Sequence, residues 1–402
     1  MIITRTDCEK ILPNRKVLTD FAISKYSDEL CGFFSENYKL TLHFRDEISG
    51  VIGRQTFFFK TIPEKMSCHK EYTKNMGVFR KEILMYKDIL NELSKLVSKQ
   101  FAPNYFYSIT DKFLVLEDMR LKGYKNCKTE YLDFDKMKAA LGAIARLHAA
   151  SIIFEEKKSI NGPFRINEQF PEALSEATFS FDETKVRYFW CQIGIRCLEE
   201  ISVYFSRNVR IASKLRKYFF SEDGFKKFLL PSEKYRNVIC HDDLWCNNFI
   251  FDDRNDCILV DFQLTRYTPP VCDVLLALHI NLDSEVLAQN MNKFLDCYYD
   301  FLSYELSLNN ISASKVIPKS EFFASAEDFK LPILIECGLY GTNVFLPEHL
   351  SLEIVSCAET FNRFYMTDRA FYILKEFHCN AKFRKRYSQV LMPLFEILEK
   401  ML

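Results

Sequence analysis

Carboxylate and amide side chains are concentrated in one stretch of the chain, residues 238–263, where they alternate with short apolar runs. Part of this stretch predicts a hairpin, with Asn248 at its start and Asp261 at its end, so that these two residues lie side by side. Asp243 approaches the same point from the preceding loop. Carboxylates and amide oxygens are hard ligands of the kind that bind Mg²⁺ together with substrate phosphates. The stretch therefore predicts a magnesium site.

The strands of this hairpin are predicted at 249–251 and 258–260, with an Asp- and Asn-rich turn, 252–256, between them. The acidic residues of the turn are explained well as solvated side chains without a chemical role. That explanation is poor for the His-Asp-Asp run at 241–243, because Trp245 follows it and a Trp among polar groups indicates a packed loop. We therefore favour metal binding by the residues that flank the turn.

The elements that must position these residues fall into two groups. Before residue 118 the chain predicts mainly strands, with one amphipathic helix over 79–97, and after it mainly helices, with the hairpin embedded among them. This order predicts an α+β protein with a small strand-rich lobe, 1–118, and a larger, mostly helical lobe, 119–402. The predicted strands are 38–44, 55–60, 105–109 and 113–116, with a turn at 31–37, and the predicted long helices are 135–150, 188–230 and 273–306.

The catalytic stretch resembles the corresponding segment of the protein-kinase-like fold, in the branch that phosphorylates small molecules. That segment has a His-x-Asp-x-x-x-x-Asn loop, matched here by His241, Asp243 and Asn248, and a hairpin that ends in Asp, matched by Asp261. The Leu-Trp-x-Asn-Asn and Asp-Phe-Gln variants of these motifs are similar to the ecdysteroid kinase-like family, also called choline-kinase-like or CHK kinase-like. The resemblance implies a bilobal protein-kinase-like fold and an ATP-dependent small-molecule kinase. Its acceptor would be a hydroxyl of an ecdysteroid or of a related polyhydroxylated or xenobiotic compound.

The resemblance also assigns catalytic roles. Asp243 would accept or orient the hydroxyl proton of the acceptor, and Asn248 and Asp261 would hold Mg²⁺. Lys60 would contact the α- and β-phosphates of ATP, and Glu82 on the amphipathic helix would position it. Together these residues would act by positioning and by stabilising charge.

Two of these assignments have alternatives. Lys60 ends a predicted strand, where a Lys side chain by itself would only point into solvent. Glu82 has a rival in Glu92 on the same helix, but the family pattern of a Glu followed four residues later by Tyr favours Glu82, because Tyr86 follows it.

The remaining nucleotide contacts are implied through the main chain. Gly32 and Ser35, in a short turn before the strand at 38–44, would cap the phosphates in place of a longer glycine-rich loop. Glu117 and Met119 occupy the position of the hinge, whose backbone would bind the edge of the adenine. An ordinary strand end is equally compatible with that segment.

Three more residues of this region are expected to serve structure. His148 lies on an apolar helical face, and we expect it to pack beneath the catalytic loop. Asp273 is expected to be an N-cap, and in kinase-like folds an Asp near this place also ties down the catalytic loop. Asp242 is expected to point away from the site, because two carboxylates facing the site would raise the pKa of one of them.

The function has several alternatives. A choline- or ethanolamine-type kinase would need an aromatic or acidic cage for the cation. A catalytically silent protein of the kinase fold would bind a nucleotide or an apolar ligand without turnover. A degenerate site of that kind would be expected to have lost at least one of four residues that are all present here, namely Lys60, Asp243, Asn248 and Asp261. A magnesium phosphohydrolase would not explain Lys60 and Glu82.

Protein-kinase activity is not expected, because the segment after Asp-Phe-Gln is short and no Ala-Pro-Glu follows. The acceptor pocket should come from 161–230 and from residues after 273.

Composition limits the partners. The chain has 402 residues with 54 basic and 54 acidic side chains, so its formal net charge is zero and a nucleic-acid partner is not expected. Its 14 Cys are scattered without a CxxC pair, which argues against a structural zinc site. Because residues 1–16 are polar and do not resemble a signal peptide, we expect a reducing compartment and a cytoplasmic protein. The apolar stretch 331–347 is broken by Glu336 and two Gly, so we expect no membrane span. We expect a monomer whose partner is a small-molecule hydroxyl acceptor.

Overall fold

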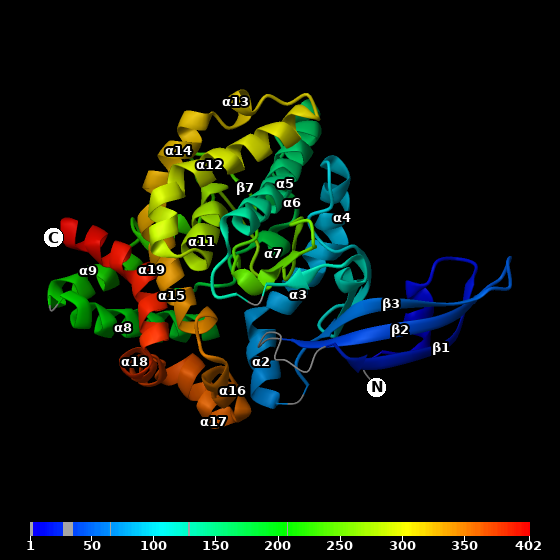
Figure 1. The fold of residues 1–402 in the computed structure, drawn as a ribbon, viewed down its shortest axis with the longest axis horizontal. Helices are drawn as coiled ribbons and strands as arrows, with labels where there is room; N and C mark the ends of the chain where they lie inside the picture. The colour runs from blue at the N-terminus through cyan, green and yellow to red at the C-terminus, as the bar shows by residue number, and fades with distance from the viewer. Residues whose placement is uncertain (1–2, 27–34, 65, 128, 207) are drawn as a thin grey trace.

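The computed structural model describes residues 3–26, 35–64, 66–127, 129–206 and 208–402. A strand-rich lobe at the N-terminus is followed by a larger, mostly helical lobe, as predicted (Figure 1). The predicted boundary at residue 118 falls between the last strand of the first sheet and a short 3₁₀ turn.

The N-terminal lobe is built on a five-stranded antiparallel sheet in the order β1-β2-β3-β5-β4. The long strands β1 to β3 project away from the helical lobe (Figure 1). Leu40, Phe57, Phe59 and Val115 form the centre of this lobe's core. The strands are β1 Lys16–Lys25, β2 Glu36–Asp46, β3 Ile52–Thr61, β4 Tyr105–Ile109 and β5 Phe113–Glu117, and helix α1, Arg5–Ile11, precedes them.

The four strands predicted for this lobe are all present, but α1 and β1 were not predicted. Strand β1 lies at the edge of the sheet, and of its ten residues only Leu18 is buried, so its sequence has no apolar alternation to detect. The turn predicted at 31–37 is wrong at its end, because Glu36 and Asn37 already pair with β3. Its residues 31–34, and with them Gly32, lie outside the described residues.

The predicted amphipathic helix is present up to Leu96, and its periodically spaced apolar residues from Phe79 to Leu93 are buried, but it is interrupted. A π-helical segment lies in its middle and a 3₁₀ turn at its end, where the 3.6-residue period is adjusted to the packing. A preceding helix, α2, was not predicted and ends at Gly77, whose φ of 70° favours glycine. The segments are α2 Ser67–Met76, α3 Val78–Leu84, η1 Met85–Leu90, α4 Asn91–Leu93 and η2 Ser94–Leu96.

The helical lobe is organised around α5, Phe134–Lys158, which is eight residues longer at its C-terminal end than predicted. By length and composition α5 could cross a membrane, but 83% of its most apolar window is buried inside the structure, as in the core helix of a folded lobe. In Figure 1 it runs beside α12 and α11. The predicted helix at 188–230 is divided into α8 Val186–Ser206, α9 Val209–Phe220 and α10 Phe225–Phe228, and that at 273–306 into α11 Val271–Asn281 and α12 Ser284–Ser307.

The rest of this lobe consists of further helices and short helical turns. They are η3 Met119–Lys122, η4 Ser159–Asn161, α6 Ile166–Gln169, α7 Pro171–Leu174, α13 Ala313–Val316, α14 Lys319–Asp328, α15 Lys330–Val344, α16 Glu348–Ser356, α17 Ala358–Asn362, η6 Arg363–Thr367, α18 Ala370–Cys379 and α19 Ala381–Lys400.

The predicted hairpin is embedded in this lobe. Strands β8, Phe249–Phe251, and β9, Cys257–Leu259, pair antiparallel, with β6, Lys125–Asn126, on the outer side of β8. Strand β7, Val238–Cys240, pairs with β10, Arg266–Thr268, and the turn η5, Cys246–Asn248, leads into β8. The loop that carries the predicted catalytic residues, called the catalytic loop below, therefore runs from the end of β7 to the start of β8.

Candidate functional site

Three predicted residues from distant parts of the sequence meet between the lobes. The Nζ of Lys60, on β3, lies 2.7 Å from Glu82 Oε2 on α3 and 2.8 Å from Asp261 Oδ1 after β9. Burial alone would lower the pKa of Lys60, but the carboxylates of Asp261 and Glu82 outweigh it and raise that pKa. Lys60 therefore stays charged and does not end in solvent. Glu92, the rival of Glu82, pairs with Lys95 at the surface.

The catalytic loop brings Asn248 against Asp243. The Nδ2 of Asn248 donates to the Asp243 carbonyl at 2.7 Å and to its carboxylate at 2.9 Å. The hairpin places the backbone of Asn248 beside Val260, next to Asp261, since the Val260 N–H donates to Asn248 O at 3.1 Å. Burial, with the negative charge of Asp261 as the second cause, raises the pKa of Asp243 to about 8.

Two residues of the site lie in the left-handed region of backbone space, Asp242 in the catalytic loop with φ of 63° and Asp261 after β9 with φ of 70°. Non-glycine residues adopt this conformation at a cost and keep it where the surroundings hold them. His241 supplies part of that support: its Nε2 hydrogen-bonds the Val260 carbonyl at 3.0 Å and its Nδ1 accepts from the Asp243 N–H at 3.3 Å. Such strained residues concentrate at functional sites.

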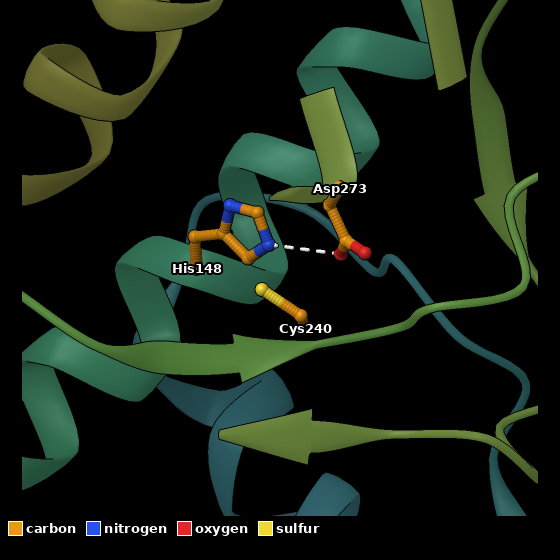
Figure 2. A group of neighbouring side chains, drawn as sticks. All are labelled: His148, Cys240 and Asp273. Atoms are coloured by element: carbon orange, nitrogen blue, oxygen red, sulfur yellow. Dashed lines mark hydrogen bonds and ion pairs between the residues drawn. The ribbon is translucent and has the colours of Figure 1, made fainter. Parts of the chain in front are cut away.

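Asp273 holds the loop from beneath. Its carboxylate accepts from the N–H groups of His241 at 2.7 Å and Asp242 at 2.9 Å, and from His148 Nε2 at 3.0 Å (Figure 2). Burial opposes ionisation of Asp273, but hydrogen bonding and the charge of His148 lower its pKa overall. The N-cap prediction is wrong, because α11 begins at Val271 and Asp273 lies inside its first turn. The tie to the loop is present instead.

The group of His148, Cys240 and Asp273 in Figure 2 has the residue types of a metal site, but its ligand atoms are already used. His148 Nδ1 lies 2.7 Å from the Tyr298 hydroxyl, and its Nε2 faces Asp273. Burial raises the pKa of the Cys240 thiol well above its ordinary value, so the thiolate that a metal needs is disfavoured. These residues support the loop, as predicted for His148.

Asp242 points away from the site, as expected. Its Oδ1 lies 2.6 Å from Arg266 Nη2, and the same guanidinium contacts Glu336 at 3.0 Å and Glu176 at 3.3 Å. The groups that most affect the pKa of Asp243 are Asp261, Asn248, Gln263 and Lys60, and Asp242 is not among them.

Of the predicted nucleotide contacts, Ser35 lines the same cleft as Asp243, whereas Glu117 and Met119 do not. Ser35 lines the cleft, with its Oγ 3.4 Å from Asn37 Oδ1. The Glu117 N–H donates to the Asn104 carbonyl at 2.9 Å and is therefore already used. The Met119 side chain packs in a small apolar cluster beneath β8 and β9, and its carbonyl accepts from the Tyr124 N–H at 3.2 Å. The Glu117 N–H and the Met119 carbonyl are thus used within the chain, and the contact of this segment with adenine stays a prediction.

A cleft with about 780 Å³ of free space, open solvent at its mouth included, extends from Asp243 and Asp261. Part of its wall comes from the segments in which the acceptor pocket was predicted, but none of the lining residues in those segments was predicted individually. An Arg and a Trp one turn apart on α8 are the only local signal. The lining residues are Ser35, Met76, Arg187, Trp190, Asp243, Trp245, Asp261, Gln263, Leu264, Tyr340, Asn343, Val344 and Tyr365.

The donor set at the floor of the cleft fits a hard cation. The Asp261 side chain is 26% exposed and faces the cleft, so its carboxylate is accessible. Because Asn248 uses its Nδ2 hydrogens on Asp243, its Oδ1 is the atom that remains for a cation. One carboxylate and one amide oxygen, completed by phosphate oxygens and water, are a typical set for Mg²⁺.

Comparisons with known proteins give one informative match. No curated protein matches the sequence. Among solved structures, the chain is similar to a Plasmodium vivax ethanolamine kinase (12% identity, TM-score 0.39, covering 91% of this chain and 83% of that chain). A choline kinase from Streptococcus pneumoniae gives 12% identity, a TM-score of 0.41, and coverage of 89% and 93%. Likeness at this level establishes neither ligand nor activity. The profile of the Ecdysteroid kinase-like family matches residues 30–310, and the chain belongs to that family.

Proposed function

We propose that the protein is an ATP-dependent phosphotransferase that acts on a hydroxyl group of a small molecule. The observation that carries the proposal is the meeting of Lys60, Glu82 and Asp261 at the floor of a cleft that Asp243 also lines. A cation held between two carboxylates suits the α- and β-phosphates of a nucleotide, and the adjacent buried Asp suits a reacting hydroxyl.

The residues would divide the work as follows. Asp243 would orient the acceptor hydroxyl and take its proton, and the burial and the Asp261 charge that raise its pKa make it a stronger base. Asn248 fixes the Asp243 carboxylate, and Lys60 would steady the phosphates while Glu82 holds it in place. Asp261 and Asn248 would hold Mg²⁺, which when bound neutralises phosphate charge and orients the transferred group.

The lining of the cleft favours a mainly apolar acceptor. Trp190, Tyr340, Val344 and Tyr365 line it with mainly apolar side chains, which suits a polyhydroxylated ring compound such as an ecdysteroid. A choline-type acceptor would use aromatic faces for its cation. The guanidinium of Arg187 already lies 3.8 Å from the centre of the Trp190 ring, which disfavours a second cation there.

The test is the thermal unfolding midpoint with and without Mg²⁺ and ATP. A ligand that binds only the folded state stabilises it by about 2.7 kcal/mol at a concentration one hundred times its Kd. We expect a Mg²⁺-dependent rise in the wild type, its loss in Asp261→Asn, and its retention in Asp253→Asn, a control in the same hairpin whose side chain is 90% exposed.

Catalysis is tested separately by phosphoryl transfer to ecdysone. Asp243→Asn should retain ATP binding and lose turnover. ATP binding without turnover on ecdysone or other hydroxylated acceptors would favour the silent-protein alternative. No midpoint shift at millimolar ATP would contradict the proposed function.

A further inference from the structure

One wall of the cleft carries a nearly buried cation. Arg187, on α8, is 7% exposed and lines the cleft. Its Nε donates to the Thr178 carbonyl at 2.6 Å, its Nη1 lies 3.2 Å from the Tyr72 hydroxyl, and its guanidinium stacks on Trp190. Neutral partners thus fix the orientation of the guanidinium without neutralising it. In the described part of the chain, no residue accepts from Nη2.

A second arginine lies behind the same ring. Arg369 is fully buried, and its guanidinium lies 4.7 Å from the centre of Trp190 and 5.0 Å from that of Phe364. Its Nη1 donates to Thr342 Oγ1 at 3.0 Å, while its Nε and Nη2 have no hydrogen-bond partner among the described residues. Burial lowers the pKa of Arg369 to about 10, so the group is still protonated at neutral pH.

Neither guanidinium has a carboxylate within ion-pair distance among the residues that the structure describes, whereas Arg266 in the same lobe has three. A buried cation without a counter-ion is costly, so such groups are normally paired. Two of them beside one indole make the cleft wall electropositive while its surface stays apolar. An anionic group placed against Arg187 would supply the missing charge.

We propose that Arg187 is an oxyanion subsite, and that the acceptor is an apolar hydroxylated molecule that also carries a carboxylate. This inference rests on the proposed function, which it deepens by naming the acceptor class. The carboxylate accepts from Arg187 through a charge-assisted hydrogen bond, while Trp190 and Tyr340 cover the rings of the acceptor. Arg369 acts through Trp190 as a positioning residue that raises the local positive potential. Cationic acceptors such as choline are rejected by like charge.

The test compares three probes on the full-length protein by calorimetry, with and without Mg²⁺ and a non-hydrolysable ATP analogue. The probes are cholate, its neutral methyl ester and choline. We expect cholate to bind at least about tenfold more tightly than methyl cholate, as a charge-assisted hydrogen bond implies, and choline not to bind. This comparison uses only the wild type and does not depend on how any variant folds.

Two variants locate the effect. Arg187→Gln should abolish the preference for cholate while leaving affinity for methyl cholate within about twofold, and Arg187→Lys should keep part of it. Arg196→Gln is the matched control, because Arg196 lies on the same helix with a side chain that is 62% exposed. Arg196→Gln should leave the preference unchanged.

The outcomes separate this proposal from the proposed function. If cholate shows no advantage over its ester, or if neither binds, the subsite is wrong even when the nucleotide binds normally. A cholate preference without any nucleotide binding would support the subsite and contradict the kinase mechanism. If Arg187→Gln weakens binding of the ATP analogue and not of cholate, the oxyanion belongs to the nucleotide phosphates, and the acceptor proposal is overturned.

Discussion

Two groups of buried arginines in the helical lobe differ in the charges that surround them. Arg266, on β10, lies within 3.3 Å of the carboxylates of Asp242, Glu176 and Glu336. Arg187 and Arg369 lie against aromatic rings, backbone and hydroxyl groups, with no carboxylate at ion-pair distance among the described residues. The first group has an excess of negative charge, and the second has only positive charge.

The difference separates support from binding. The Arg266 group closes on itself: Asp242 belongs to the catalytic loop and Glu336 to α15, so the guanidinium ties the back of that loop to a core helix. Because each carboxylate of this cluster contacts the Arg266 guanidinium, the cluster needs no bound ligand. In the second group Arg187 lines the cleft and Arg369 is buried behind its wall, and in our proposal a bound molecule supplies the missing negative charge. A buried charge that the fold leaves unpaired is therefore a better marker of a ligand subsite than burial or charge alone.

The largest expected effect comes from opening the closed group. Arg266→Met leaves the buried carboxylates of Asp242 and Glu336, and the half-buried one of Glu176, without this cation, and we expect the free energy of unfolding to fall by about 3–5 kcal/mol. Urea denaturation at pH 7.5 measures the change. Arg254→Met is the control, since the Arg254 side chain is 89% exposed and its pairing with Asp252 is worth little.

A fall below about 1 kcal/mol in Arg266→Met would mean that the three carboxylates are accommodated without this cation. The comparison between the two groups would then lose its physical basis, because burial of unpaired charge in this lobe would be cheap. The proposal for Arg187 would be weakened with it.

The excess of negative charge also predicts a pH dependence. Burial raises the pKa of Glu336 to about 7 from 4.5 against the attraction of Arg266, and Glu176 adds to the rise. A carboxyl whose pKa is higher in the folded state contributes stability below its unfolded pKa and loses that contribution as the pH rises through the folded value. Glu336→Gln cannot ionise, so between pH 5 and pH 8 the wild type should lose about 1–3 kcal/mol relative to this variant.

Unfolding curves at pH 5, 6, 7 and 8 measure this difference, with the exposed Glu353→Gln as control. Parallel stability profiles for wild type and Glu336→Gln would show that Glu336 is ionised throughout. In that case Arg266 would balance the carboxylates more fully than its contacts suggest.

The contrast also shows what the sequence could and could not predict. Four strands of the first sheet were predicted, the one at 38–44 from its apolar alternation, and the pairing of Lys60 with Glu82 followed from a helix pattern and the family resemblance. Edge strand β1 lacked alternation, because only Leu18 of it is buried. The roles of the site residues remain predictions, although the structure brings Lys60, Glu82 and Asp261 together.

The two arginine groups themselves were not predicted. An Arg in a sequence is by default a surface residue, and nothing near Arg369 or Arg266 marks either as buried. Whether a buried Arg is neutralised depends on segments far along the chain, as with Arg266 and Glu336. Local pattern therefore identified the catalytic loop, whereas the cleft wall needed the three-dimensional structure.

The smallest expected effect tests the open group. Arg369→Met removes a fully buried cation that has one hydrogen bond, to Thr342, and keeps an unbranched side chain against Trp190. Relief of the desolvation cost should outweigh the lost stacking, so we expect the free energy of unfolding to rise by about 1 kcal/mol. The same variant should weaken cholate binding, because it lowers the positive potential at Arg187.

Denaturation and calorimetry on one preparation measure both the stability and the cholate affinity, with Arg210→Met on α9 as the exposed control. Higher stability with weaker carboxylate binding is the trade-off of a site held ready for a ligand, whereas a loss above about 2 kcal/mol would show that Arg369 is structural, like Arg266.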